Sequence, residues 1–349
     1  MKVLLYSDNM NLVQKSGVYR AYEHQKEALT TAGVSYTINK EDDYDIVHIN
    51  TVFPASFRMS IRSKLKGKKV VYHAHSTKED FRNSFKGSNL LAPFFKQWIK
   101  LCYNSADVII TPTEYSAKLI KSYGIRKTIV PISNGISMDE YQRDQELGRK
   151  FRKKYGYQEL DRVVISVGHY MERKGILDFI ELAKLHPEYQ FIWFGYTAPS
   201  LVTEHVRQAM KVKLPNLQFA GYVEEEQLKE AYYGSDLFLF LSHEETEGIV
   251  VLEALASKIP VLLRDIPVYE GWINDGMEAY KADNQKDFSA KLEGILEGKL
   301  KSTVADGYRL ACLKDIRKVG KKLEEAYHMA ESKQKVKRVF QFHISKLVQ

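Results

Sequence analysis

Short runs of apolar residues alternate along the chain with longer stretches in which apolar and polar residues recur at helical spacing. The short runs are apolar almost throughout, which is typical of parallel strands that are buried on both faces. The first set of predicted strands covers residues 3–6, 46–49, 70–73, 108–111 and 128–131. After a charged stretch, a second set covers residues 163–167, 190–194, 217–220, 237–241 and 261–263. The alternation predicts an α/β protein with parallel sheets covered by helices.

The restart of this pattern near residue 160 predicts two such units in tandem. A chain of 349 residues is long enough for two domains that each bury a core. We therefore expect a first domain at residues 1–142, a second at 143–320, and a basic helical tail at 321–349 that returns to the first domain. Because ligands of such sheets bind at the carboxyl ends of the strands, two facing units would form a central cleft.

Composition adds limits on the class of protein. Hydrophobic residues make up 44% and charged residues 28% of the chain, as in ordinary globular proteins. The chain contains no run of 18 apolar residues, and residues 1–10 predict a first strand rather than a signal peptide. Cys102 and Cys312 form no metal-binding or disulfide pattern, which favours a reducing, cytoplasmic compartment.

The stretch HEETEGIVVLEALASKIPV, residues 243–261, contains four carboxylates but otherwise has the composition of a buried segment. A predicted strand ends just before it, Gly248 allows a tight turn, and residues 249–257 predict a helix. Glu245 then lies in the loop and Glu253 one turn into the helix, both at the edge of the sheet. Carboxylates there could accept hydrogen bonds from sugar hydroxyls, or they could complement the helix dipole.

A second stretch, VISVGHYMERKGILDFIELAKL at residues 164–185, joins a strand to a helix through a basic turn. Backbone N–H groups at such a helix start, with Arg173 and Lys174 beside them, suit a diphosphate. The alternative is a charged turn that only contacts solvent.

The stretch VVYHAHSTKEDF, residues 70–81, is an apolar strand that ends in two histidines. His75 is the candidate site residue, and we expect His73 to point to the opposite face. A histidine at a strand end can also be purely structural. Gly17, in the loop after the first strand, would allow close approach of the backbone to a ligand, although a plain turn needs a glycine as well.

These motifs, in this order, resemble the retaining glycosyltransferases of family 4, which have the two-domain fold called GT-B. The resemblance implies that Glu245 contacts the donor sugar and Glu253 the ribose of the nucleotide. It also implies that the turn between them contributes to donor binding through Gly248, Ile249 and Val250. The chain departs from the family pattern by having Thr246-Glu247 where the family has Gly-Phe.

The resemblance extends to the other motifs. Lys174 matches the lysine of the family, whereas His169 stands at the place of the family's arginine, so Arg173 or His169 is expected to supply the missing cation. His75 is implied to lie next to the reacting carbon and to orient the donor sugar. The family's loops around the phosphate and the base correspond here to Gly195, Tyr222 and Val223.

No cofactor and no metal ion are expected. The Asp-x-Asp at residues 43–45 precedes a strand, so we interpret it as a surface segment rather than a metal site. The resemblance implies metal-independent chemistry, with the leaving diphosphate stabilised by Lys174, Arg173 and helix dipoles.

The net charge of +8 is concentrated in one segment, because residues 56–100 contain 11 Lys and Arg against two acids. Apolar and aromatic residues are interleaved with these cations, with Phe94, Trp98 and Leu101 on one predicted helical face. This pattern predicts docking on an anionic membrane surface. The alternative is a core-facing helix with a solvated basic back, and no nucleic-acid-binding motif accompanies the charge.

Within the family, the chain resembles bacterial enzymes that build glycosyl-diacylglycerol anchors for lipoteichoic acid. The predicted activity is retaining transfer of a hexose, galactose, from a UDP-sugar to a glycolipid such as glucosyl-diacylglycerol. The enzyme would be peripherally bound to the inner face of the cell membrane. One alternative is a transferase for capsule or cell-wall polysaccharide, which needs no membrane-binding helix. The other is a nucleotide- or nucleic-acid-binding protein without enzymatic activity.

Overall fold

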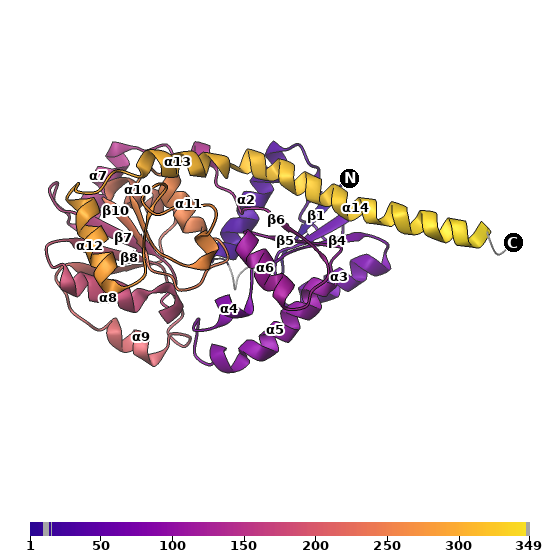
Figure 1. The fold of residues 1–349 in the computed structure, drawn as a ribbon, viewed down its shortest axis with the longest axis horizontal. Coiled ribbons are helices and arrows are strands. Elements are labelled where there is room, and N and C mark those ends of the chain that lie inside the picture. Colours follow the sequence, from indigo (N-terminus) through magenta and orange to yellow (C-terminus); the bar gives the residue numbers. More distant parts are fainter. Residues whose placement is uncertain (10–13, 15, 347–349) are drawn as a thin grey trace. The chain divides into compact units, whose positions relative to one another are not determined.

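The computed structural model describes residues 1–9, 14 and 16–346, with side chains through Ser332 (Figure 1). The chain forms two compact units. Unit 1 comprises Met1–Thr77, Pro93–Gly135 and the chain from Ile316 onward, and unit 2 comprises Lys78–Ala92 and Ile136–Asp315. The boundaries predicted from the sequence were residues 142 and 320. The structure differs mainly in that residues 78–92, predicted in the first domain, belong to unit 2.

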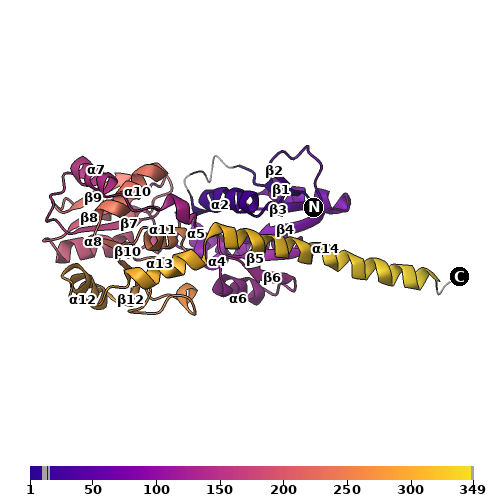
Figure 2. The ribbon, with the colours of Figure 1, turned by 90° about the horizontal axis from the view of Figure 1, so that it is seen from above.

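Unit 1 is built on a six-stranded parallel sheet with the order β2-β1-β3-β4-β5-β6. Its strands are β1 (Val3–Tyr6), β2 (Tyr36–Thr37), β3 (Ile46–Ile49), β4 (Lys69–His73), β5 (Val108–Thr111) and β6 (Thr128–Pro131). One face is covered by α2 (Gly17–Thr31) and α14 (Ile316–Lys346), as Figure 2 shows. The other face is covered by α3 (Pro54–Leu65), α5 (Ser88–Asn104) and α6 (Glu114–Ser122).

Helix α14 packs closely against α2 at the core of unit 1. Ile316, Leu323 and Tyr327 are buried in the same cluster as the strand residues Val3 and Val71. Gly320 permits this approach, since a Cβ at that position would overlap the backbone carbonyl of Ala28 in α2. The segment that follows unit 2 in the chain is therefore part of the core of unit 1.

Unit 2 contains a second six-stranded parallel sheet, with the order β12-β11-β10-β7-β8-β9. Its strands are β7 (Val163–Val167), β8 (Gln190–Phe194), β9 (Leu217–Gly221), β10 (Leu237–Phe240), β11 (Val261–Arg264) and β12 (Tyr280–Ala282). Its helices are α4 (Lys78–Phe81), α7 (Gln145–Tyr155), α8 (Ile176–Leu185), α9 (Glu204–Ala209), α10 (Glu225–Gly234), α11 (Ile249–Ala256), α12 (Gln285–Leu296) and α13 (Val304–Leu313). Helices α8, α9 and α12 pack on one face of the sheet around Phe179, Phe191 and Trp193.

The predicted α/β architecture with two parallel sheets is confirmed. All ten predicted strands are present within one residue at either end, because each is an apolar run bounded by turn residues. The short edge strands β2 and β12 were not predicted, since two or three half-exposed residues carry no such signal. In the described part of the chain, no helix is both long and apolar enough to cross a membrane.

Candidate active site

The strand order of unit 2 fixes where a ligand can bind. Strands β7 and β10 are neighbours, but the chain leaves β7 toward β8 on one side and leaves β10 toward β11 on the other. In doubly wound sheets, ligands bind in the crevice that this reversal opens at the carboxyl ends of the strands. The loops that begin there are 168–175 and 241–248, the two stretches that the sequence analysis singled out.

A buried ion pair joins these two loops. Lys174 Nζ contacts Glu245 Oε1, and the Ser242 hydroxyl donates to the same oxygen at 2.6 Å. Only 15% of the Lys174 side chain and 8% of the Glu245 side chain are exposed. Burial alone would raise the pKa of Glu245, but Lys174 and Arg173 outweigh it and hold that pKa below its usual value. Burial also lowers the pKa of Lys174, and Glu245 offsets this shift only in part.

Glycine makes the close approach of the loops possible. Gly175 has a φ of +77°, and a Cβ there would overlap the carbonyl oxygen of Leu241 at the end of β10. Gly195, with a φ of +138°, approaches the carbonyl oxygen of Gly168 in the same way. Gly195 therefore has a structural reason to be glycine, and its predicted contact with the donor phosphate stays a prediction.

Two helices begin at this crevice without a side-chain cap. Helix α8 starts after Gly175 and α11 starts after Gly248, and both glycines have left-handed backbone angles. The first N–H groups of a helix have no partner within the helix, and the helix dipole adds partial positive charge there. Ile249 and Val250, which were predicted to contribute to donor binding, form the N-terminal turn of α11. Together with Lys174, this turn forms a site suited to a diphosphate.

Arg173 is held by several partners in unit 2. Its side chain donates to the Ser84 hydroxyl at 3.0 Å and the Glu244 carbonyl at 2.7 Å, and its Nη1 lies 3.1 Å from Asp80 Oδ1. Burial raises the pKa of Asp80, an effect that Arg173 opposes. Through Ser84 and Asp80, Arg173 thus binds the 78–92 segment next to the Lys174–Glu245 pair. Its contact with a phosphate stays a prediction.

His169 does not replace the family's arginine as a cation. Its Nδ1 donates to the Tyr196 carbonyl at 2.6 Å, and burial lowers its pKa despite that bond. The lowered pKa favours the neutral ring at pH 7, with Nε2 as an acceptor, so Lys174 and Arg173 are the cations beside Glu245. Tyr222 and Val223 follow β9, and the Tyr222 ring is 38% exposed and accessible to a ligand.

Glu253 occupies the predicted place one turn into α11. It is 1% exposed, and the Tyr232 hydroxyl donates to its Oε2 at 3.0 Å. Three partners of these residues were not predicted from the sequence. They are Tyr232 beside Glu253, Ser242 beside Glu245 and Asp80 beside Arg173. Ser242 could have been found, because it follows directly after a predicted strand, whereas Tyr232 and Asp80 are distant in sequence from the residues that they contact. Glu247, which replaces an apolar residue of the family pattern, is fully buried.

Two of the predicted site residues, His75 and Gly17, lie in unit 1. His75 follows β4 and is 8% exposed, and its Nε2 lies 3.1 Å from Asn50 Oδ1. The expectation that His73 points to the opposite face was wrong, because residues two apart in extended chain share a face, and the two rings stack with centroids 4.1 Å apart. Gly17 begins α2 and has open space around it. Most of the preceding loop, residues 10–13 and 15, lies outside the described residues.

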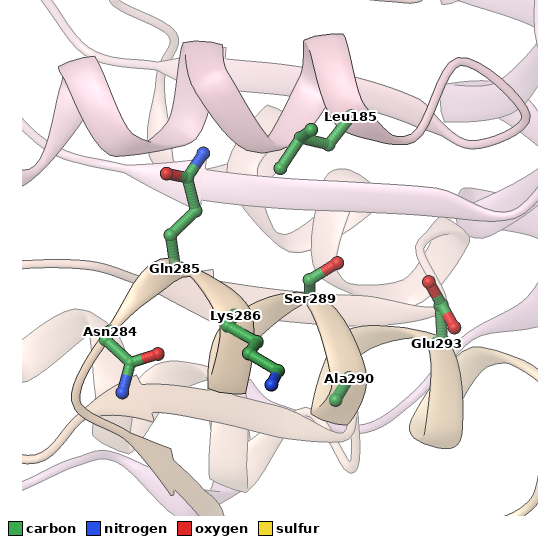
Figure 3. A pocket seen from close by; sticks show the side chains of 7 residues that line it. All are labelled: Leu185, Asn284, Gln285, Lys286, Ser289, Ala290 and Glu293. Atoms are coloured by element: carbon green, nitrogen blue, oxygen red, sulfur yellow. The ribbon is translucent and has the colours of Figure 1, made fainter.

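Two other features lie away from this crevice. The pocket in Figure 3 is a surface hollow of about 670 Å³ that contains none of the predicted site residues. It is lined by Leu185 of α8 and by Asn284, Gln285, Lys286, Ser289, Ala290 and Glu293. Asp43 and Asp45 precede β3 and pair with Lys68 and with the amino end of the chain. Among the described residues, no three His, Cys, Asp or Glu side chains gather as metal ligands. Metal independence stays a prediction.

The comparisons with known proteins cover nearly the whole chain. A family model described as "Glycosyltransferase Family 4" matches residues 10–140, and one described as "Glycosyl transferases group 1" matches residues 148–308. The processive diacylglycerol alpha-glucosyltransferase of Acholeplasma laidlawii is 43% identical over 328 residues, which are 94% of this chain and 98% of that protein. The alpha-galactosylglucosyldiacylglycerol synthase of Streptococcus pneumoniae is 26% identical over 317 residues, covering 89% and 81%.

A solved structure, that of Anabaena Alr3699/HepE in complex with UDP and glucose, matches with a TM-score of 0.74. It covers 94% of this chain and 99% of that chain at 16% identity. At this level of identity the match shows a shared fold.

Replacing Lys174 with Met leaves the Glu245 carboxylate buried, with the Ser242 hydroxyl and the more distant Arg173 as its partners. We expect the free energy of unfolding at pH 7 to fall by about 3 kcal/mol, as when one partner of a buried pair is removed. Because the folded-state pKa of Glu245 is lowered, the contribution of the pair is present at neutral pH and is lost as the pH falls through that pKa. Urea titrations at pH 7 and pH 4 measure both effects.

The matched control is Lys184→Met, which breaks an exposed pair with Glu181 and should cost at most ~0.5 kcal/mol. The double variant Lys174→Met with Glu245→Gln should recover part of the loss. Equal stability of Lys174→Met and the unchanged protein would contradict the buried pair.

Proposed function

This chain belongs to the family 4 glycosyltransferases of the GT-B fold, and we propose that it transfers a hexose from a UDP-sugar to a diacylglycerol-based membrane lipid. The observation that carries the proposal is the Lys174–Glu245 pair, which lies at the strand reversal of unit 2 beside two uncapped helix starts. A nucleoside diphosphate sugar has the matching groups, with two anionic phosphates and a ring of hydroxyls. UDP and glucose are the ligands named for the solved HepE structure.

Each part of the donor has a partner in the proposed complex. The diphosphate lies against the N-terminal turns of α8 and α11 and receives the positive charge of Lys174. Glu245 accepts hydrogen bonds from hexose hydroxyls, which is favourable because it stays ionised. Glu253 faces the ribose hydroxyls, and Tyr222 with Val223 borders the base.

The proposed reaction retains the configuration at the anomeric carbon. The bond between C1 and the β-phosphate oxygen breaks, and its electron pair stays on that oxygen. The acceptor oxygen bonds to C1 from the same side, and its proton passes to a phosphate oxygen. Glu245 is not assigned as a nucleophile, since its carboxylate is held by Lys174 and Ser242.

We propose glucose as the transferred sugar, in place of the galactose predicted from the sequence. The relative with 43% identity is named as a glucosyltransferase, whereas the one named for galactosylglucosyldiacylglycerol is 26% identical. Both names contain diacylglycerol, which supports diacylglycerol or its monoglucoside as the acceptor. A polysaccharide acceptor would give no reason for the surface of unit 1 described next.

Helix α3 buries Met59 and several serines but leaves other apolar residues exposed. The small polar residues Ser56, Ser60 and Ser63 face the protein, where Ser60 and Ser63 bond to Ser105 and Tyr44. Leu65 is 84% exposed and Ile61 is 39% exposed. Exposed cations alternate with them on the same face, namely Arg58, Arg62 and Lys66. An outward face of this composition suits the interface of an anionic membrane.

Helix α5 continues this surface. Phe57 of α3 packs edge-to-face on Trp98 of α5, so the two helices are neighbours. Phe94 is 73% exposed and Leu101 is 50% exposed. Trp98, which was predicted to share the exposed face of α5 with these two residues, is instead partly buried. Its indole donates to the Val52 carbonyl at 2.6 Å. We propose that α3 and α5 hold the enzyme on the cytoplasmic face of the membrane, next to its lipid acceptor.

The proposed activity is tested by incubating the protein with labelled UDP-glucose or UDP-galactose and vesicles that contain diacylglycerol or glucosyl-diacylglycerol. We expect labelled glycolipid with UDP-glucose. Lys174→Met should reduce the rate by about 10²–10³-fold, as for loss of one group that stabilises developing charge. Circular dichroism verifies that the variant is folded at the assay temperature, and Lys184→Met serves as control. No labelled lipid from any pair, or an unchanged rate in Lys174→Met, would refute the proposal.

Membrane docking is tested by flotation with vesicles that contain anionic lipid. The double variant Leu65→Glu with Phe94→Glu should bind at least ~10-fold more weakly, because each side chain loses about 1.5–3 kcal/mol of apolar burial. Binding of the unchanged protein should weaken as salt is added. Leu160→Glu, at a 91% exposed leucine of unit 2, is the matched control and should bind as before. Equal binding by the double variant and the control would contradict the assignment of this surface.

A further inference from the structure

The sheet of unit 1 has its own strand reversal, between β1 and β3. The chain leaves β1 toward β2 on one side and leaves β3 toward β4 on the other. Asn50 follows β3, and His75 lies two residues after β4. By the rule that places ligands at the carboxyl ends of strands beside such a reversal, both residues are at a binding position.

His75 is the last of three stacked imidazole rings. The centroids of His75 and His73 are 4.1 Å apart, those of His73 and His48 are 5.4 Å apart, and the rings are parallel within 5°. Gln25 of α2 donates to His73 Nδ1 at 2.8 Å, and Tyr327 of α14 lies 2.7 Å from His48 Nδ1. The stack therefore runs from α14 to the carboxyl end of β4.

The three rings are neutral. Burial lowers the pKa of His75 to about 3, and burial with a smaller effect of His75 lowers that of His48 to about 3. Burial, then His75 and His48, lower the pKa of His73 well below its usual value. Among the described residues, no carboxylate contributes to these shifts. Two phenols also lie near the stack, since Tyr327 contacts His48 and Tyr103 donates to the carbonyl of Ser76, the neighbour of His75.

A neutral imidazole carries one proton, and Asn50 determines where that proton lies. The Oδ1 of Asn50 can only accept, so the 3.1 Å contact requires the proton of His75 on Nε2. The Nδ1 of His75 then has a free lone pair, and no described residue donates to it. Asn50 is 2% exposed, and its Nδ2 has no partner among the described residues.

We propose that Asn50 is a positioning residue that keeps His75 in the Nε2–H tautomer, so that Nδ1 accepts a hydrogen bond from a sugar hydroxyl of the substrate. The inference rests on the proposed function for the identity of that substrate. A lone pair of a neutral ring can accept from a hydroxyl but has nothing to donate to a phosphate oxygen. The group that His75 recognises is therefore a hydroxyl of the donor hexose or of a glycosylated acceptor.

The tautomer is measured directly by nitrogen NMR on protein labelled with ¹⁵N-histidine, with the His75 signals identified by their loss in His75→Gln. We expect a protonated Nε2 and an unprotonated Nδ1 at pH 7. UDP-glucose or glucosylglycerol should shift the Nδ1 signal, and UDP alone should leave it in place. Which of the two sugars shifts it identifies the source of the hydroxyl. A charged ring, an Nδ1–H tautomer, or an unmoved Nδ1 signal with both sugars would overturn the proposal.

Kinetics of Asn50→Asp separate positioning from a purely structural role. The carboxylate still accepts from Nε2, but its charge favours the imidazolium and raises the pKa of His75. Protonation turns Nδ1 into a donor, so kcat/KM of this variant should rise from pH 6 to pH 8, whereas that of the unchanged enzyme stays flat. Asn50→Ala should lower kcat by about 10–100-fold with little change in KM for UDP-glucose, as for loss of one hydrogen bond to a buried group.

Asn39→Ala, at an exposed asparagine of unit 1, is the matched control and should change neither quantity. Thermal unfolding of each variant verifies that it is folded. Parallel pH profiles of Asn50→Asp and the unchanged enzyme would overturn the positioning role. The NMR titration needs no turnover, so it decides the role of Asn50 even if the protein transfers no sugar.

Discussion

The Lys174–Glu245 pair is the interaction on which the candidate site depends. Two charged groups that are this well buried are costly to desolvate, and the cost is offset only when geometry and further hydrogen bonds are good. The structure meets this condition through the Ser242 hydroxyl and through Gly175, which lets the start of α8 touch the end of β10. The same backbone approach places two uncapped helix starts at the crevice, so one local constraint brings an ionised carboxylate and two positive helix ends together.

The two units have different chemistry at their strand reversals. Unit 2 has ionised groups at its strand reversal, which suits a charged leaving group in a water-poor site. At its own reversal, unit 1 has neutral groups, Asn50 and His75, which suit hydroxyls. Its helix α3 directs serines and Met59 inward and leaves Ile61 and Leu65 exposed among cations. A lipid acceptor with a hydroxyl headgroup would match both features of unit 1.

Much of the fold and of the candidate site could be predicted from the sequence. Fully apolar runs identify buried parallel strands, and residues that follow such runs lie at the carboxyl edge, which located Glu245 and Lys174. Other features depend on contacts between distant segments. The packing of 78–92 on Arg173, and the contact of Tyr232 with Glu253, have no local signal. The orientation of His73 was predicted wrongly, because side chains two residues apart in an extended chain share a face. The exposure of Trp98 was also predicted wrongly, because an aromatic ring on an amphipathic helix fits either a core or a surface.

The central claim is that the pair and the helix starts of unit 2 hold a nucleotide-activated hexose. The most direct measurement is a crystal structure of the protein with UDP. The account predicts phosphate oxygens within hydrogen-bonding distance of Lys174 Nζ and of the first N–H groups of α11, with the ribose at Glu253. UDP bound elsewhere on unit 2, with Lys174 still contacting Glu245 and no phosphate nearby, would contradict it.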